Sequence, residues 1–307
     1  LMLEVLIQMA GLILCGIVWQ MVRPAGLDPA ATRTVLTSVV YYLMLPALVL
    51  SVLWEAELGA QTLQTAAAGI FGILIGLLLS IFTCRACQAS PAVTGAIVLA
   101  AAFPNVTYLG LPVLEATYGS WSRSVAIQYD LFAATPMLFT IGILVSAHYG
   151  HGRSSVRGML TELRNIPALW AALLAVLLNV SGVPMPSLVD GLLGLLERGV
   201  VPLMLISLGL SLKWDRSQWR TLPSVVPVAI ISLLVIPAVV YPFTGLIGLE
   251  GEWRSAVVLE AAMPSMVLGL VLCDRFDLDT TLYATAVTVT TALSLVTLPL
   301  WYGWMSG

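Results

Sequence analysis

Two short segments of the sequence combine a helix-breaking proline with small polar residues inside an apolar run. The first is Pro104-Asn105-Val106-Thr107, followed by Gly110 and Pro112, and the second is Pro264-Ser265. A proline inside a helix removes one backbone hydrogen bond and clashes with the preceding turn. The second half of a broken helix has free N–H groups and a positive dipole end, which attract an anion. These segments therefore favour carboxylate binding.

Two acidic residues, Asp130 and Glu260, also lie inside apolar runs. At the helical rise per residue they lie about 10 Å and about 11 Å from the predicted outer ends of their helices. Ionisable groups at such depth are candidates for function. Their oxygens, with those of Asn105 and Thr107, could coordinate a sodium ion; alternatively, one carboxyl could carry a proton. The matching depths suggest one shared polar pocket, and a role in helix packing alone is the alternative for each acid.

No catalytic motif accompanies these residues. The sequence has no phosphate-binding loop, nucleophile elbow or zinc-protease motif. Cys84-x-x-Cys87 lacks a second pair and is interpreted as two free thiols, so no metal centre is expected. We expect no enzyme activity and no cofactor beyond a coupling sodium ion or proton. A receptor or an intramembrane enzyme is the rival class, but no pair of reactive residues has suitable spacing.

The composition requires a membrane protein. Of the 307 residues, 59% are hydrophobic and 9% are charged, whereas a soluble domain has about 25% charged residues. This excludes a soluble enzyme, a nucleic-acid-binding protein and a disordered chain, and the lipid bilayer is the expected partner. A spanning helix needs about 20 apolar residues. Ten segments fit that length, near 3–22, 34–54, 62–83, 92–118, 124–147, 165–182, 188–212, 222–247, 253–275 and 279–304.

The basic residues predict the orientation in the inner (plasma) membrane. With the N-terminus outside, the external connections hold only Arg123, Arg198 and Arg254. The cytoplasmic side then holds ten basic residues: Arg23, Arg33, Arg85, Arg153, Arg157, Arg164, Lys213, Arg216, Arg220 and Arg275. Positive residues favour the cytoplasmic side, so both termini are predicted outside. No Arg or Lys lies mid-span, and the helix dipoles are therefore the evident attraction for an anion.

The chain divides into two halves of five segments. We expect a first repeat over 1–149, a cytoplasmic connection over 150–164 and a second repeat over 165–307. An odd number of helices per half inverts the second half in the membrane. The segment 99–105 resembles 259–265, with the same residue at four of seven positions. Paired interrupted helices in inverted repeats indicate the binding site of a transporter, and simple proline kinks are the alternative interpretation.

The segment from Asn105 to Pro112 resembles the Asn-x-x-x-x-Gly-Leu-Pro signature of the auxin efflux carrier family, which includes bacterial members and the plant PIN-type carriers. Three further stretches are similar to the pattern of that family: Tyr42–Leu48, Ser207–Leu212 and Ala261–Pro299. The resemblance covers essentially the whole chain.

The resemblance implies an all-α membrane protein with ten helices in two inverted repeats, in which broken helices four and nine cross. It implies a scaffold of helices 1, 2, 6 and 7, a transport domain of helices 3–5 and 8–10 that moves like an elevator, and a homodimer. The substrate would be a small organic anion, auxin-like or a dicarboxylate. Asn105 would contact it, and the residues around the crossover would be Pro104, Thr107, Gly110, Pro264 and Ser265.

A second, more distant resemblance concerns Glu260. The bile acid:sodium symporter family has a glutamate at a similar point of helix nine, where it is a sodium ligand. This resemblance implies a cation site at Glu260. A sodium-coupled symporter of sterol-like or other organic anions is therefore the alternative function.

Overall fold

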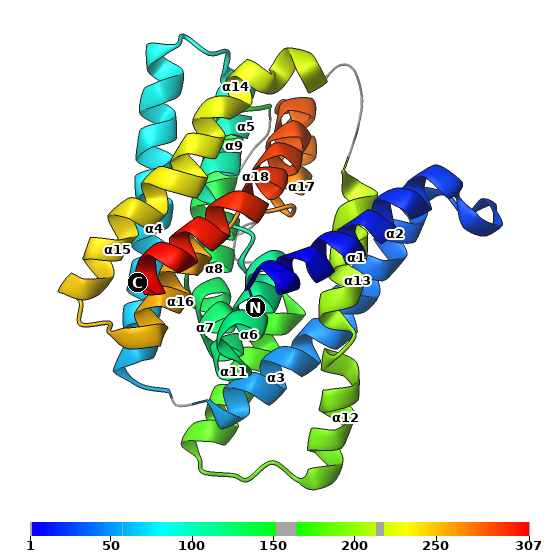
Figure 1. Cartoon of the computed structure of the whole chain (residues 1–307), viewed down its shortest axis with the longest axis vertical. Coiled ribbons are helices and arrows are strands. Elements are labelled where there is room, and N and C mark those ends of the chain that lie inside the picture. The colour runs from blue at the N-terminus through cyan, green and yellow to red at the C-terminus, as the bar shows by residue number, and fades with distance from the viewer. Residues whose placement is uncertain (1, 57, 152–163, 213–217, 307) are drawn as a thin grey trace.

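The protein is all-helical over the residues that the computed structural model describes, which are 2–56, 58–151, 164–212 and 218–306 (Figure 1). Most of the predicted connection 150–164 lies outside the described residues, as do Lys213 and Arg216. The helical elements in chain order are α1 (Met2–Val22), η1 (Pro24–Gly26), α2 (Pro29–Val39), η2 (Val40–Met44), α3 (Leu45–Glu55), α4 (Ala60–Ala86), α5 (Pro91–Ala102), η3 (Val106–Gly110), α6 (Leu111–Tyr118), α7 (Ser122–Tyr129), η4 (Asp130–Ala134), α8 (Thr135–Met137), η5 (Leu138–Gly142), α9 (Ile143–Tyr149), α11 (Pro167–Val180), α12 (Ser187–Glu197), α13 (Val200–Ser211), α14 (Gln218–Ile230), η6 (Ile231–Val235), α15 (Ile236–Leu246), α16 (Gly251–Ala261), α17 (Gly269–Arg275) and α18 (Thr280–Ser306).

Six helices of the described chain are long and apolar enough to cross a membrane: Pro29–Glu55, Ala60–Ala86, Ser122–Tyr149, Ser187–Ser211, Thr221–Leu246 and Thr280–Ser306. Large apolar side chains cover outward surfaces, as Leu63, Leu78 and Phe82 do on α4. Such a surface is stable in lipid rather than in water. The predicted all-α membrane protein is confirmed. The other four predicted segments correspond to α1, α11 and two interrupted helices.

Short π-helical segments let several spans continue through proline. Since proline clashes with the carbonyl one turn earlier, a widened turn before it removes the conflict. Each of these prolines lies two residues after a π-helical segment: Pro46, Pro112, Pro136 and Pro237. At Pro104 and Pro264, by contrast, the chain leaves the helix altogether.

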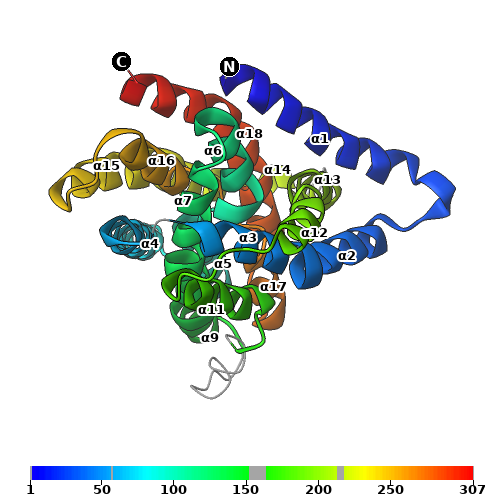
Figure 2. The ribbon, with the colours of Figure 1, turned by 90° about the horizontal axis from the view of Figure 1, so that it is seen from below.

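The helices pack in two groups. In the first, here called the α13 group, α13 packs against α1 and α2, and α3 packs against α11 and α12. In the second, the α4 group, α4 packs against α5, α7 and α15, and α18 packs against α5, α14 and α17. Figure 2 shows α1, α2, α12 and α13 on the opposite side of the molecule from α4, α15 and α16. The α6–α7 pair and η3 lie at the boundary, where they contact α1, α3 and α13.

The α13 group is held tightly at the contact between α1 and α13. A Cβ atom on Gly16 would lie 2.9 Å from the Cα of Gly209. Small residues that allow such backbone approach are typical of helix packing in membranes. The two glycines therefore fix α1 directly on α13.

Candidate functional site

The two interrupted helices meet at their breaks. The N–H of Asn105 donates to the carbonyl of Pro264 at 2.8 Å, and the N–H of Met266 donates to the carbonyl of Phe103 at 2.9 Å. These bonds form an isolated antiparallel bridge between the two breaks. In lipid, backbone groups freed from a helix need such internal partners. Each break therefore satisfies the other, and the crossing is a fixed structural unit.

Helix α18 supports this crossing from one side. The hydroxyl of Tyr283 donates to the carbonyl of Met266 at 2.6 Å. The N–H of Ser265 donates to the hydroxyl of Thr290 at 3.1 Å. Both side chains are buried. Sequence reasoning missed their role because a buried Tyr or Thr in an apolar helix has no distinctive spacing.

A small cavity of about 40 Å³ lies beside the crossing, and we call it the Asn105 cavity. The side chain of Asn105 lines it and is 1% exposed, and its amide nitrogen has no hydrogen-bond partner among the described residues. Asp130 also lines the cavity and accepts hydrogen bonds from the hydroxyls of Thr107 and Thr135. Because buried polar groups are nearly always hydrogen-bonded, the unpaired amide marks a position for a ligand.

The predicted substrate-binding residues do not all face this cavity. Asn105 and Thr107 line it. Pro104 lines a separate gap next to Tyr129. Pro264 and Ser265 take part in the backbone bonds of the crossing. Gly110 is buried against Glu260 instead.

Glu260 is fully buried in α16, and neither of its carboxylate oxygens has a hydrogen-bond partner among the described residues. Its carboxylate lies so close to Gly110 that a Cβ atom there would collide with it. It does not line the Asn105 cavity. Of the two acids only Asp130 lines this cavity, and one polar pocket shared by Asp130 and Glu260 stays a prediction. Both acids contact η3, but Asp130 does so through the hydroxyl of Thr107 and Glu260 does so at Gly110.

A larger cavity of about 220 Å³ adjoins the first, and we call it the Arg33 cavity. Tyr41, Tyr108 and Leu268 line both cavities. Among the residues that the structure describes, Arg33 is the only charged one in its lining. Sequence reasoning missed Arg33 as a site residue because a basic residue near a helix end is already explained by the orientation rule.

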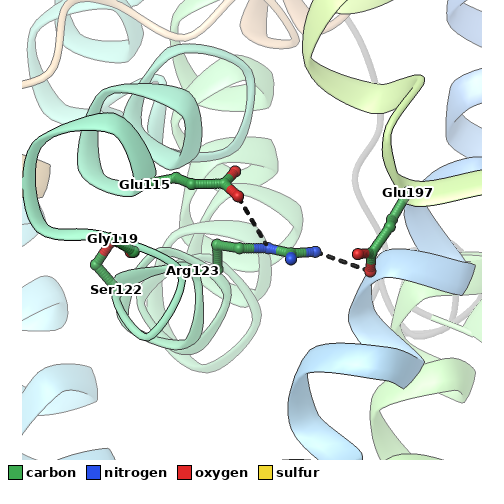
Figure 3. A network of polar contacts seen from close by, with 5 residues as sticks. All are labelled: Glu115, Gly119, Ser122, Arg123 and Glu197. Carbon is green, nitrogen blue, oxygen red and sulfur yellow. Dashed lines mark hydrogen bonds and ion pairs between the residues drawn. The ribbon is translucent and has the colours of Figure 1, made fainter. Parts of the chain in front are cut away.

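A third cavity of about 390 Å³, the Glu115 cavity, lies between α1, α3, α6 and α13. Along α13 its lining is Val201, Pro202 and Leu205, nearer the start of the helix than the lining of the Arg33 cavity. Figure 3 shows Arg123 between two acids at this cavity. Its Nη2 atom lies 2.8 Å from the carboxylate of Glu197, and its Nε atom lies 4.0 Å from that of Glu115. The closer ion pair joins α7 of the α4 group to α12 of the α13 group.

An apolar helical bundle whose two broken helices meet beside buried, unpaired polar groups defines a membrane transport protein. The comparison with protein families agrees, because the family described as "Membrane transport protein" matches residues 3–156 and 151–302. The chain belongs to this family, the auxin efflux carriers.

Relatives extend over much or all of the chain. It is 32% identical over 302 residues to an uncharacterized transporter of Methanothermobacter thermautotrophicus, covering 97% of this chain and 96% of the relative. It is 29% identical over 214 residues to the uncharacterized transporter MJ1031 of Methanocaldococcus jannaschii, covering 69% and 68%. It is 23% identical over 208 residues to the uncharacterized transporter YfdV of Escherichia coli, covering 66% and 65%.

Proposed function

We propose that the protein is a secondary transporter that moves a small organic anion across the membrane by alternating access. The unpaired amide of buried Asn105, placed where two broken helices meet, is the observation that carries this proposal. The backbone N–H groups that follow it, in Val106, Thr107 and Tyr108, donate to no backbone carbonyl among the described residues. Free N–H groups at the start of a helix favour a negative charge.

The proposed architecture has ten membrane helices in two inverted repeats, 1–149 and 165–307. Six continuous spans, the shorter helices α1 and α11, and two interrupted helices support this count. The α13 group is the proposed scaffold and the α4 group the proposed transport domain. All three cavities adjoin both groups, as an elevator movement of one group along the other requires.

The orientation and assembly belong to the same proposal. With both termini outside, the Arg33 cavity lies on the cytoplasmic side and the Glu115 cavity on the external side. The family resemblance implies a homodimer, and size measurement of the purified protein in lipid nanodiscs tests this.

Asp130 and Glu260 are the proposed residues for coupling to a sodium ion or a proton. Asp130 shares a cavity with Asn105. The two unpaired, buried oxygens of Glu260 fit a bound cation, because a buried carboxylate otherwise needs hydrogen-bond donors. This feature also favours the second candidate function, a sodium-coupled symporter of organic anions with Glu260 in the cation site.

Flux measurements in proteoliposomes test the proposal. The protein is expected to move at least one member of a panel of mono- and dicarboxylates, and Asn105→Ala is expected to abolish this flux. Gln61→Ala is the matched control, since Gln61 is an exposed amide at the start of α4. Flux that persists in Asn105→Ala would remove the crossing from the mechanism.

The coupling test uses gradients in the same vesicles. A sodium gradient that drives flux, and that loses its effect in Glu260→Gln, supports the symporter. A proton gradient with the same dependence on Glu260 supports proton coupling. Coupled flux that is unchanged in both Glu260→Gln and Asp130→Asn would refute the role of these acids.

A further inference from the structure

The Arg33 cavity contains a positive side chain that faces no acid among the residues that the structure describes. Arg33 is partly buried in α2, and it has no ion-pair partner among the described residues. The other charged cavity differs, because there Arg123 is paired with Glu197. An unpaired cation in a lining of low polarity attracts an anion more strongly than the same cation in water.

A second, independent feature of this cavity also indicates a ligand. The side chain of Ser207, in α13, is 2% exposed and lines the cavity. Its hydroxyl has no hydrogen-bond partner among the described residues. A buried hydroxyl of this kind is a donor that a carboxylate oxygen would satisfy. The cation and the hydroxyl both belong to the α13 group.

We infer that the Arg33 cavity is a second binding site for the transported anion, where Arg33 and Ser207 hold the carboxylate and select for its charge. This inference rests on the proposed function of the crossing. It assigns the charge selectivity to a side chain of the α13 group instead of the helix dipoles at the crossing.

Arg33 and the Asn105 cavity are separated along the helix that carries Arg33. Arg33 and Tyr41 lie eight residues apart on one helix, which is about 12 Å at the helical rise. Tyr41 is where the lining of the Asn105 cavity begins. Because the two cavities also share lining residues, we expect the anion to pass between Arg33, in the α13 group, and Asn105, at the crossing.

The remaining lining indicates the chemical class of the anion. Met204, Leu208 and Val271 give the lining apolar surface in addition to its single cation. A monocarboxylate with an apolar body matches both features. A compact dicarboxylate would leave its second charge without a partner, because Arg33 is the only charged residue that the described part of the chain contributes to the lining.

Competition between an acid and its neutral amide tests the site. For a monocarboxylate that the parent protein transports, Arg33→Gln is expected to raise KM roughly tenfold or more, the loss typical of one charge-assisted hydrogen bond. The corresponding primary amide is expected to inhibit Arg33→Gln about as well as the acid does, whereas the parent protein prefers the acid. Arg33→Lys is expected to retain that preference, and Ser207→Ala to raise KM by a smaller factor.

Arg85→Gln is the matched control, because Arg85 is exposed in the last turn of α4 and lines none of the three cavities. If the parent protein transports no carboxylate, the proposed function fails. If it does, and Arg33→Gln still prefers acid to amide with an unchanged KM, the Arg33 site is refuted while the proposed function stands. Should Arg33→Gln not fold, Ser207→Ala and Arg33→Lys decide instead. A raised KM in Ser207→Ala together with a retained preference for the acid in Arg33→Lys supports the site. An unchanged KM in Ser207→Ala together with a lost preference in Arg33→Lys refutes it.

Discussion

Gly110 is the position where a single methyl group tests the packing of the crossing most directly. Its backbone has φ −62° and ψ −52°, which alanine adopts freely. The obstacle is the fully buried carboxylate of Glu260, with which a Cβ atom would collide. Overpacking of a dense interior costs about 1–3 kcal/mol. Since the carboxylate is enclosed on all sides, we expect Gly110→Ala to lower the free energy of unfolding by about 2 kcal/mol.

A double-mutant cycle isolates the collision. In the Glu260→Ala protein the carboxylate is absent. Adding Gly110→Ala to this protein is therefore expected to change the free energy of unfolding by no more than about 0.5 kcal/mol. Reversible unfolding in mixed micelles measures both steps. Gly303→Ala is the control, because a Cβ atom there meets nothing within 4 Å. If Gly110→Ala lowered stability equally in the parent protein and in Glu260→Ala, the Glu260 side chain would not be the reason that position 110 requires glycine.

Three further predictions concern contacts outside the Asn105 and Arg33 cavities. The side chains of Arg123 and Glu197 are 16% and 15% exposed. A double-mutant cycle of Arg123→Gln and Glu197→Gln is therefore expected to give a coupling free energy of about 1–2 kcal/mol, which lies between the values for surface and for buried ion pairs. Glu115→Gln is expected to lower the free energy of unfolding by less than about 0.5 kcal/mol, because Glu115 is 41% exposed and lies 4.0 Å from Arg123. If Glu115→Gln and Glu197→Gln lowered it equally in the same unfolding assay, the ion pair with Glu197 would not be the stronger one. Tyr283→Phe removes the hydroxyl bonded to Met266, and we expect it to lower stability by about 1–2 kcal/mol and to reduce flux as well, whereas unchanged stability would show that α18 does not hold the crossing.

Length and hydropathy were sufficient to locate the helices. The predicted segment 62–83 corresponds to Ala60–Ala86, and 124–147 corresponds to Ser122–Tyr149. The agreement is close because lipid requires long apolar runs with internally bonded backbones. The breaks at Pro104 and Pro264 were predictable because proline removes a helical hydrogen bond and clashes with the preceding turn. The hydrogen bonds that join them were not, since they depend on how two distant segments pack.

The site was predictable in part. Helical rise gives the depth of a side chain in the membrane, but it does not give the direction in which that side chain points. Asp130 and Glu260 illustrate this limit, because they have similar predicted depths and yet contact different residues of η3. Arg33 shows the converse problem. Its type and position suit the cytoplasmic boundary, and only the packing of α2 against α13 places it in a cavity.

The crossing alone is poorly suited to select an anion by charge. The N–H groups of Asn105, Ser265 and Met266 are already bonded across the crossing or to α18, and those of Val106, Thr107 and Tyr108 carry only partial charges. The acids Asp130 and Glu260 also lie against η3. A neutral amide at Asn105 can orient a carboxylate but contributes no charge. Arg33 supplies the missing charge, yet on the other helix group. In the proposed division, the α13 group selects the anion by its charge and the α4 group carries it. Such a division would avoid burying an arginine at the centre of the moving α4 group, where a charged side chain in the membrane would be costly.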